Sequence, residues 1–149
     1  MKRRLLLLAP LSLAIARRAC AASTTIGPIT ITHPWAAPSV TEAAAMFLEM
    51  NNSGPRADRL IGASTPIAGT VIFRARDGTP LEYYDLLPRR PVSLRPGRRY
   101  IALRDLKGPL ALDDTFPVTL RFARAGSIAI TVVVEAGPED DASDTPAPR

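Results

Sequence analysis

The sequence predicts an all-β domain, built either as a sandwich or as a barrel. Short apolar runs follow one another at close spacing, and fifteen prolines and nine glycines punctuate the chain. Few stretches repeat their apolar residues at the period of a helix, which argues against a helical bundle. A length of 149 residues gives one domain with room for a core and argues against a multidomain enzyme. With 46% hydrophobic and 22% charged residues, the body of the chain is expected to fold.

Each predicted strand ends where the sequence turns. The first apolar run stops at His33-Pro34, and the second ends in the Asn- and Gly-containing turn 51–55. Asp77-Gly78 is a hairpin signal after the fourth run, and Pro96-Gly97 turns the chain between the sixth and the seventh. The last two runs alternate in the manner of half-buried strands and join at Ala125-Gly126. The predicted strands are residues 29–32, 44–50, 60–64, 70–76, 81–86, 92–94, 99–103, 116–122 and 128–134.

The N-terminal segment 1–21 is predicted to be an export signal peptide. It starts with Lys2-Arg3-Arg4, continues with an apolar run, and ends in the small-residue pattern Ala19-Cys20-Ala21. The secretory route is favoured over the twin-arginine route, which Arg3-Arg4 also suits. The segment is too short to span a bilayer, so no membrane span is expected in the mature chain. Cys20 follows Arg17-Arg18-Ala19, which lacks the small and apolar residues of a lipoprotein signal, so no lipid anchor is expected.

The other regions follow from composition. Segment 1–21 holds five of the nineteen basic residues and no acid, so the mature chain has fourteen of each sign. Segment 136–149 holds four acids, one arginine and no large apolar residue, and is predicted to be a disordered tail. The folded domain is therefore 22–135, with thirteen basic and ten acidic residues. A neutral exported chain is not expected to bind nucleic acid.

Catalytic chemistry finds little support in the mature chain. It holds no cysteine, which excludes disulfides, thiolate nucleophiles and thiolate metal sites. Its single histidine leaves no basis for a nucleophile–base triad, and no glycine-rich phosphate loop is present. The sequence therefore predicts a protein that is not an enzyme.

Several landmarks occur in a recognisable order: Ile31 to Ala36, which includes His33-Pro34-Trp35, then 58–64, Gly69-Thr70-Val71 and Leu94-Arg95-Pro96-Gly97. Together with the closing hairpin they resemble the periplasmic copper chaperones of the PCu(A)C type over about residues 27–135. The resemblance implies a cupredoxin-like Greek-key β-sandwich or barrel, a periplasmic location and a role in metal homeostasis.

The resemblance also implies a ligand set that this sequence lacks. The family binds Cu(I) through His and Met side chains arranged as two His-x-Met pairs, because a soft cation prefers imidazole and thioether ligands. The matching positions hold Arg74 and Arg76 in one pair and Tyr100 and Ala102 in the other, and Tyr83 is the nearest match to a further family Met. Arginine stays protonated and offers no lone pair, so no metal is expected at these positions.

The soft ligands left in the mature chain are His33, Met46 and Met50. The two methionines share a strand face with Leu48, which favours packing in the core over metal binding. His33 is interpreted as a structural landmark that hydrogen-bonds rather than ligates. No cofactor is expected, and copper(I) at these weak candidates is kept as the alternative.

Strand parity indicates what replaced the ligands. It places Arg98, Tyr100 and Arg104 on one face of their strand, and Arg74 and Arg76 on one face of theirs. Guanidinium groups bind carboxylate or phosphate, so these five residues are the candidate site for an anion or partner, with a solvated charged face as the simpler interpretation. Two functions remain open: a divergent copper chaperone using weak or borrowed ligands, and a non-metal adaptor for an acidic partner or small anion. A periplasmic protein partner is expected.

Overall fold

The computed structural model describes residues 23–137, which form eleven β-strands and, within that range, no helix. The predicted export segment 1–21 and residues 138–149 of the predicted tail lie outside the described residues. The strands are β1 (Ser23–Ile26), β2 (Ile29–Ala36), β3 (Ala43–Asn52), β4 (Asp58–Ser64), β5 (Ala68–Arg74), β6 (Pro80–Leu81), β7 (Tyr84–Leu86), β8 (Val92–Leu94), β9 (Tyr100–Leu106), β10 (Thr115–Phe122) and β11 (Gly126–Val134).

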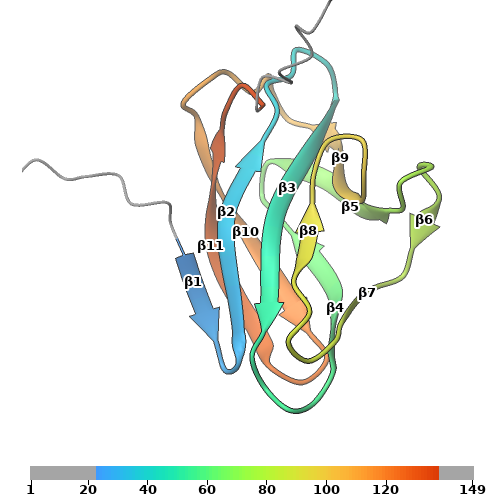
Figure 1. Ribbon diagram of the computed structural model, residues 1–149. Helices are drawn as coiled ribbons and strands as arrows, with labels where there is room; N and C mark the ends of the chain where they lie inside the picture. The colour runs from blue at the N-terminus through green and yellow to red at the C-terminus, as the bar shows by residue number, and fades with distance from the viewer. Residues whose placement is uncertain (1–22, 138–149) are drawn as a thin grey trace, which may run out of the picture.

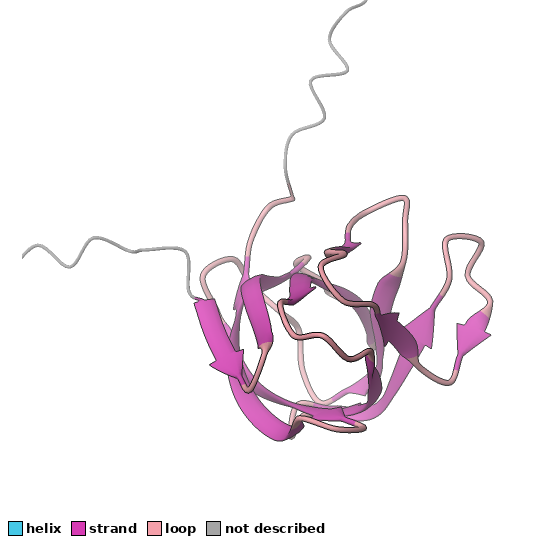
Figure 2. Cartoon of the chain, turned by 60° about the horizontal axis from the view of Figure 1, so that its bottom comes forward, coloured by secondary structure: helices cyan, strands magenta, loops and turns pink. Residues whose placement is uncertain are grey.

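The strands form one strongly curved sheet in the order β6-β5-β9-β3-β2-β11-β10-β4-β7, with β1 paired to β2 and β8 paired to β3. Viewed from its lower end, the sheet encloses a barrel-like core (Figure 2). The order departs from a simple meander because β3 neighbours β9 and β2 neighbours β11, and the β2–β11 pair is parallel. The predicted all-β class is confirmed.

The core is built by the inward positions of the strands. In β10 the burial alternates residue by residue, with Phe116, Val118, Leu120 and Phe122 inside. The partner strand β11 repeats this pattern with Ile130, Val132 and Val134, as the sequence predicts. Each large apolar side chain removed from water stabilises the fold by roughly 1.5–3 kcal/mol, so this periodicity accounts for the architecture.

Several strand boundaries differ from the predicted ones. The first run does not stop at His33-Pro34, because a β-bulge carries β2 through them to Ala36. The bulge holds His33 at φ +46°, a conformation that a pattern of residue types does not reveal. The predicted strand 70–76 ends earlier, at Arg74, and the predicted strand 81–86 is divided into β6 and β7.

Two buried polar side chains fix the loops at the lower end of the barrel. The Asp58 carboxylate accepts hydrogen bonds from the backbone N–H groups of Arg59, Arg124 and Ala125 at 2.8–2.9 Å. Asn52 donates to the carbonyl oxygens of Arg56 and Leu86 at 2.7 and 3.1 Å. The β8–β9 turn, which carries an arginine cluster, lies at the opposite, upper end (Figure 1). The buried hydrogen bonds of Asp58 and Asn52 therefore fix the end of the barrel that lies away from the arginine cluster.

Candidate functional site

The strand register brings together most of the positions that the resemblance predicts to correspond to copper ligands. Arg74 of β5 pairs with Tyr100 of β9, and two residues further along β9 Ala102 pairs with Ile72. Arg76 follows β5 two residues beyond Arg74. We call Arg74, Arg76, Tyr100 and Ala102 the ligand corner. It contains two guanidinium groups, a phenol and a buried methyl group, none of which is a soft ligand.

A tyrosine outside the corner joins its two strands. The Tyr84 hydroxyl accepts a hydrogen bond from the Arg74 N–H at 3.0 Å and lies 2.6 Å from the Tyr100 carbonyl oxygen, to which it donates. The Arg74 carbonyl oxygen is 2.9 Å away as a second acceptor. The ring packs against Phe73, with 5.0 Å between centroids. Burial raises the pKa of Tyr84 to about 12, so the hydroxyl keeps its proton at neutral pH.

Arg74 is committed to its own hairpin. Its Nη1 donates to the Gly78 carbonyl oxygen at 2.9 Å, and the turn is closed by the Gly78 N–H, which donates to the Ala75 carbonyl oxygen at 3.0 Å. Gly78 has φ +85°, which other residues adopt only with strain. The Arg74 guanidinium is therefore partly satisfied within the protein.

Four arginines line a pocket of about 580 Å³ that adjoins the ligand corner and shares Arg76 with it. Arg95, Arg98 and Arg99 come from the β8–β9 turn, where the Arg98 N–H donates to the Arg95 carbonyl oxygen at 3.0 Å. Gly97 has φ +73°, as Pro96-Gly97 in a tight turn requires. Arg76 enters from the end of β5. We call this pocket the arginine basin; its lining is Arg76, Pro91, Val92, Ser93, Arg95, Arg98 and Arg99.

The lining of the arginine basin is cationic, and a carboxylate close to it in the fold is that of Glu49, which accepts a hydrogen bond from Ser93 Oγ at 3.4 Å. No carboxylate belongs to its lining, and none of its arginines forms an ion pair within the described residues. The nearest acid in sequence, Asp77, accepts a hydrogen bond from the N–H of Thr79 at 3.0 Å, which lowers the pKa of Asp77 and keeps it in its own turn. Exposed, permanently charged guanidinium forks are suited to binding carboxylate or phosphate oxygens.

The five predicted anion-site residues do not form one cluster. Arg76 and Arg98 lie in the arginine basin. Tyr100 and Arg104 line a separate shallow groove of about 370 Å³, whose walls include Ala43 and Ala45 of β3. Arg95 and Arg99 complete the basin and are not among the predicted site residues, because Arg95 lies in the turn and parity in the predicted strand 99–103 places Arg99 on the face opposite Tyr100. The Pro96-Gly97 turn was the available signal, since it folds its flanking residues onto each other.

The weak metal candidates lie apart. Met46 and Met50 are both fully buried in the core. His33 is on the surface, where its Nε2 lies 2.8 Å from the Glu135 Oε2 and its ring stacks on Trp35. The three side chains therefore make no common site. Among the described residues no group of three or more His, Cys, Asp or Glu side chains is placed to hold a metal ion.

Comparison with solved structures identifies the fold. The apo PCuAC domain from PmoF1 is 26% identical with a TM-score of 0.72, covering 77% of this chain and 99% of that domain. The copper-bound PCuAC domain from PmoF2 is 28% identical with a TM-score of 0.73, covering 77% and 98%. The Cu(I) form of DR1885 from Deinococcus radiodurans, at 21% identity, 80% and 85% coverage and a TM-score of 0.57, shows a likeness of fold.

A sequence family described as "Putative lipoprotein LpqE-like" matches residues 29–134, whereas no curated protein matches the chain. The lipoprotein description of the family agrees with the predicted export. Within residues 23–137 the structure contains no helix that is long and apolar enough to cross a membrane. The chain belongs to the LpqE-like family, and its domain has the fold of the PCuAC domains.

Proposed function

We propose that this exported protein holds no Cu(I) with its own ligand corner and binds an acidic partner or a small anion beside it. The observation that carries the proposal is the arginine basin, where four arginines gather without a carboxylate in the lining. Cations repel a metal ion and attract carboxylates, so the same end of the barrel favours the opposite sign of ligand. The proposed role is binding rather than catalysis, in the periplasm, after export by the secretory or twin-arginine route.

The local geometry supports the loss of copper. Arg74 and Arg76 offer no lone pair, and the Tyr84 hydroxyl already joins the backbones of Arg74 and Tyr100. In a metal site, ligands from two strands are joined through the ion. Here a protonated phenol makes that connection, so the corner is ordered without a metal.

Copper carriage is the second candidate. It is favoured by the 28% identity to the copper-bound PCuAC domain from PmoF2. Copper would then be cargo, and His33 is the exposed soft ligand that the described range offers, since both methionines of that range are buried. This function therefore requires ligands lent by a partner protein.

Two titrations of the chain without residues 1–21 test these functions. In the first, Cu(I) is titrated against a chromophoric chelator, and no competition above that of a His33→Ala variant is expected. In the second, a peptide of ten aspartates is titrated at low and physiological salt. The Arg76→Glu/Arg98→Glu variant is expected to lose at least about tenfold in affinity, and the wild-type affinity to fall with salt.

The matched control is Arg121→Glu/Arg124→Glu, which reverses two exposed charges on β10 and the turn that follows it. It is expected to stay within about threefold of the wild type, the residual being long-range attraction. Equal losses in both double variants would show that only net charge matters, which would refute a site at the arginine basin. Stoichiometric Cu(I) binding by the wild type would establish the second candidate instead.

A further inference from the structure

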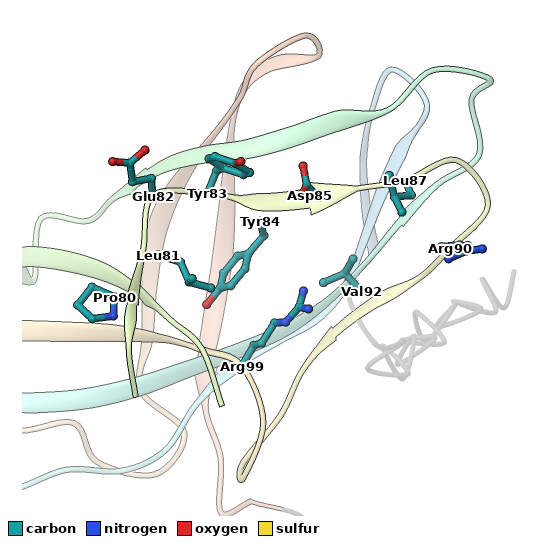
Figure 3. Close-up of a pocket in the computed structure, with 10 residues that line it drawn as sticks. All are labelled: Pro80, Leu81, Glu82, Tyr83, Tyr84, Asp85, Leu87, Arg90, Val92 and Arg99. Atoms are coloured by element: carbon teal, nitrogen blue, oxygen red, sulfur yellow. The ribbon is translucent and has the colours of Figure 1, made fainter. Parts of the chain in front are cut away.

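A second pocket, of about 650 Å³, adjoins the arginine basin. It lies between the β6–β7 segment and the strands β8 and β9 (Figure 3), and it shares Val92 and Arg99 with the basin. We call it the tyrosine groove; its lining is Pro80, Leu81, Glu82, Tyr83, Tyr84, Asp85, Leu87, Arg90, Val92 and Arg99. Its volume falls within the range of about 300–1,000 Å³ typical of ligand pockets.

The walls of the tyrosine groove are largely apolar. Leu81, Val92 and the Tyr84 ring border it, together with Leu87, which is 43% exposed, whereas the Tyr83 side chain points to the opposite side of the β6–β7 segment (Figure 3). An exposed apolar side chain beside apolar walls adds to the surface that a second molecule can cover. The hydroxyl of the Tyr84 ring that borders the groove is occupied by hydrogen bonds to backbone groups.

The charges around the groove are arranged with one sign inward. Arg99 extends into the space between Tyr84 and Val92, whereas Glu82 and Asp85 lie on the opposite side of the β6–β7 segment (Figure 3). The Asp85 Oδ1 lies 3.1 Å from Nε of Arg59, in an ion pair. The Arg59 guanidinium carbon also lies 4.3 Å from the centroid of the Tyr83 ring. The groove thus offers an apolar cleft that leads to a free cation.

We propose that the tyrosine groove receives one large apolar side chain of an acidic peptide segment, whose neighbouring carboxylates lie over Arg99 and the arginine basin. This inference rests on the proposed function and names the partner: a peptide with an apolar anchor, not a small anion. Because Arg99 and Val92 line both pockets, an anchor in one places adjacent residues at the other. A small anion would need the basin alone and would leave the apolar walls uncovered.

Two dye-labelled peptides test the proposal by fluorescence anisotropy with the chain lacking residues 1–21. One carries a single Phe followed by four Asp, and the other carries Ala in place of Phe. The Phe peptide is expected to bind about tenfold more tightly, from burial of the ring. In the Leu81→Ser/Leu87→Ser variant this preference is expected to disappear, while the salt-sensitive affinity for the Ala peptide stays at its wild-type value.

The matched control is Val40→Ser/Leu112→Ser, which removes two exposed apolar side chains far from the groove lining and is expected to keep the tenfold preference. Equal salt-sensitive binding of the two peptides by the wild type would overturn the anchor while leaving the proposed function standing. Binding of neither peptide would overturn both. A preference that survives the Leu81→Ser/Leu87→Ser change would place the apolar contact elsewhere and would also overturn the inference.

Discussion

The closing hairpin β10–β11 and the β5–β9 pair both place apolar side chains inward, but they differ in what their outer sides lead to. In the hairpin, eight residues of β10 pair in unbroken register with β11, and the inward ones are apolar. In the β5–β9 pair, Phe73 lies opposite Ile101 and Val71 opposite Leu103 on the inner side. The outer side of that pair instead carries Arg74 and Tyr100, and leads to the arginine basin.

The difference shows which positions maintain the fold and which are free to change. Phe73, Ile101 and Leu103 are buried, so substitutions there cost packing energy. Arg74 and Tyr100 on the outer side are only half-buried and Arg76 is exposed, so an arginine or a soft ligand at such positions alters the chemistry of the surface without disturbing the core. A TM-score of 0.73 to a copper-bound domain is therefore compatible with a corner that lacks soft ligands.

The largest expected effect lies in the hairpin. Leu120→Ala removes a fully buried side chain from β10 and is expected to lower the free energy of unfolding by about 2–5 kcal/mol. Urea denaturation measures the loss. The neighbouring exposed change Thr119→Ala is the control and is expected to stay within about 0.5 kcal/mol. A loss below about 1 kcal/mol in Leu120→Ala would mean that the hairpin contributes less to the core than its burial indicates.

The hairpin could be predicted from the sequence because its physical determinant is the period-two alternation that the sequence displays directly. Phe116, Val118 and Leu120 are all inside, as their spacing indicates. The bulge at His33-Pro34 could not be predicted, because its left-handed backbone depends on the register between β2 and β3 rather than on residue type. Local patterns also did not indicate the break between β6 and β7.

The candidate site could be predicted only in part. Parity identifies outward positions, and it correctly separates Arg74 from Phe73. Parity does not determine the contacts that long flexible side chains make. The Arg74 guanidinium donates to the Gly78 carbonyl oxygen, and Arg104 lines another groove. The role of Tyr84 depends on a contact across sixteen residues, to the Tyr100 carbonyl oxygen, which only the folded chain specifies.

The next largest effect concerns the connection between the two strands of the corner. Tyr84→Phe leaves the Arg74 N–H and the Tyr100 carbonyl oxygen without their shared hydroxyl, and is expected to cost about 1–3 kcal/mol. Urea denaturation measures the loss, and amide hydrogen exchange at Arg74 is expected to accelerate. Tyr83→Phe, at an exposed neighbouring ring, is the control and is expected to change neither quantity.

The same hydroxyl gives the corner a predicted pH dependence. The pKa of Tyr84 is about 12 in the folded protein and about 10 in the unfolded chain, so the stabilisation is fully present below pH 10 and is lost as the pH rises toward 12. Stability of the wild type is therefore expected to fall more steeply over this window than that of Tyr84→Phe. Parallel curves for the two proteins would show that the hydroxyl is not buried in the way described.

The smallest expected effect is a change in stability that has one sign in the arginine basin and the opposite sign at an ion-paired arginine elsewhere on the surface. Arg98 lies among three other arginines without a carboxylate in the pocket lining, so Arg98→Gln is expected to raise stability by a few tenths of a kcal/mol at low salt. Arg59→Gln removes one partner of the Asp85 ion pair and is expected to lower stability by a similar amount. Both changes are expected to vanish in urea denaturation near 1 M salt, where the Debye length is about 3 Å.

If Arg98→Gln also destabilised the protein at low salt, its guanidinium would have a structural partner. Its position in a cluster of arginines would then no longer argue for an external anionic ligand.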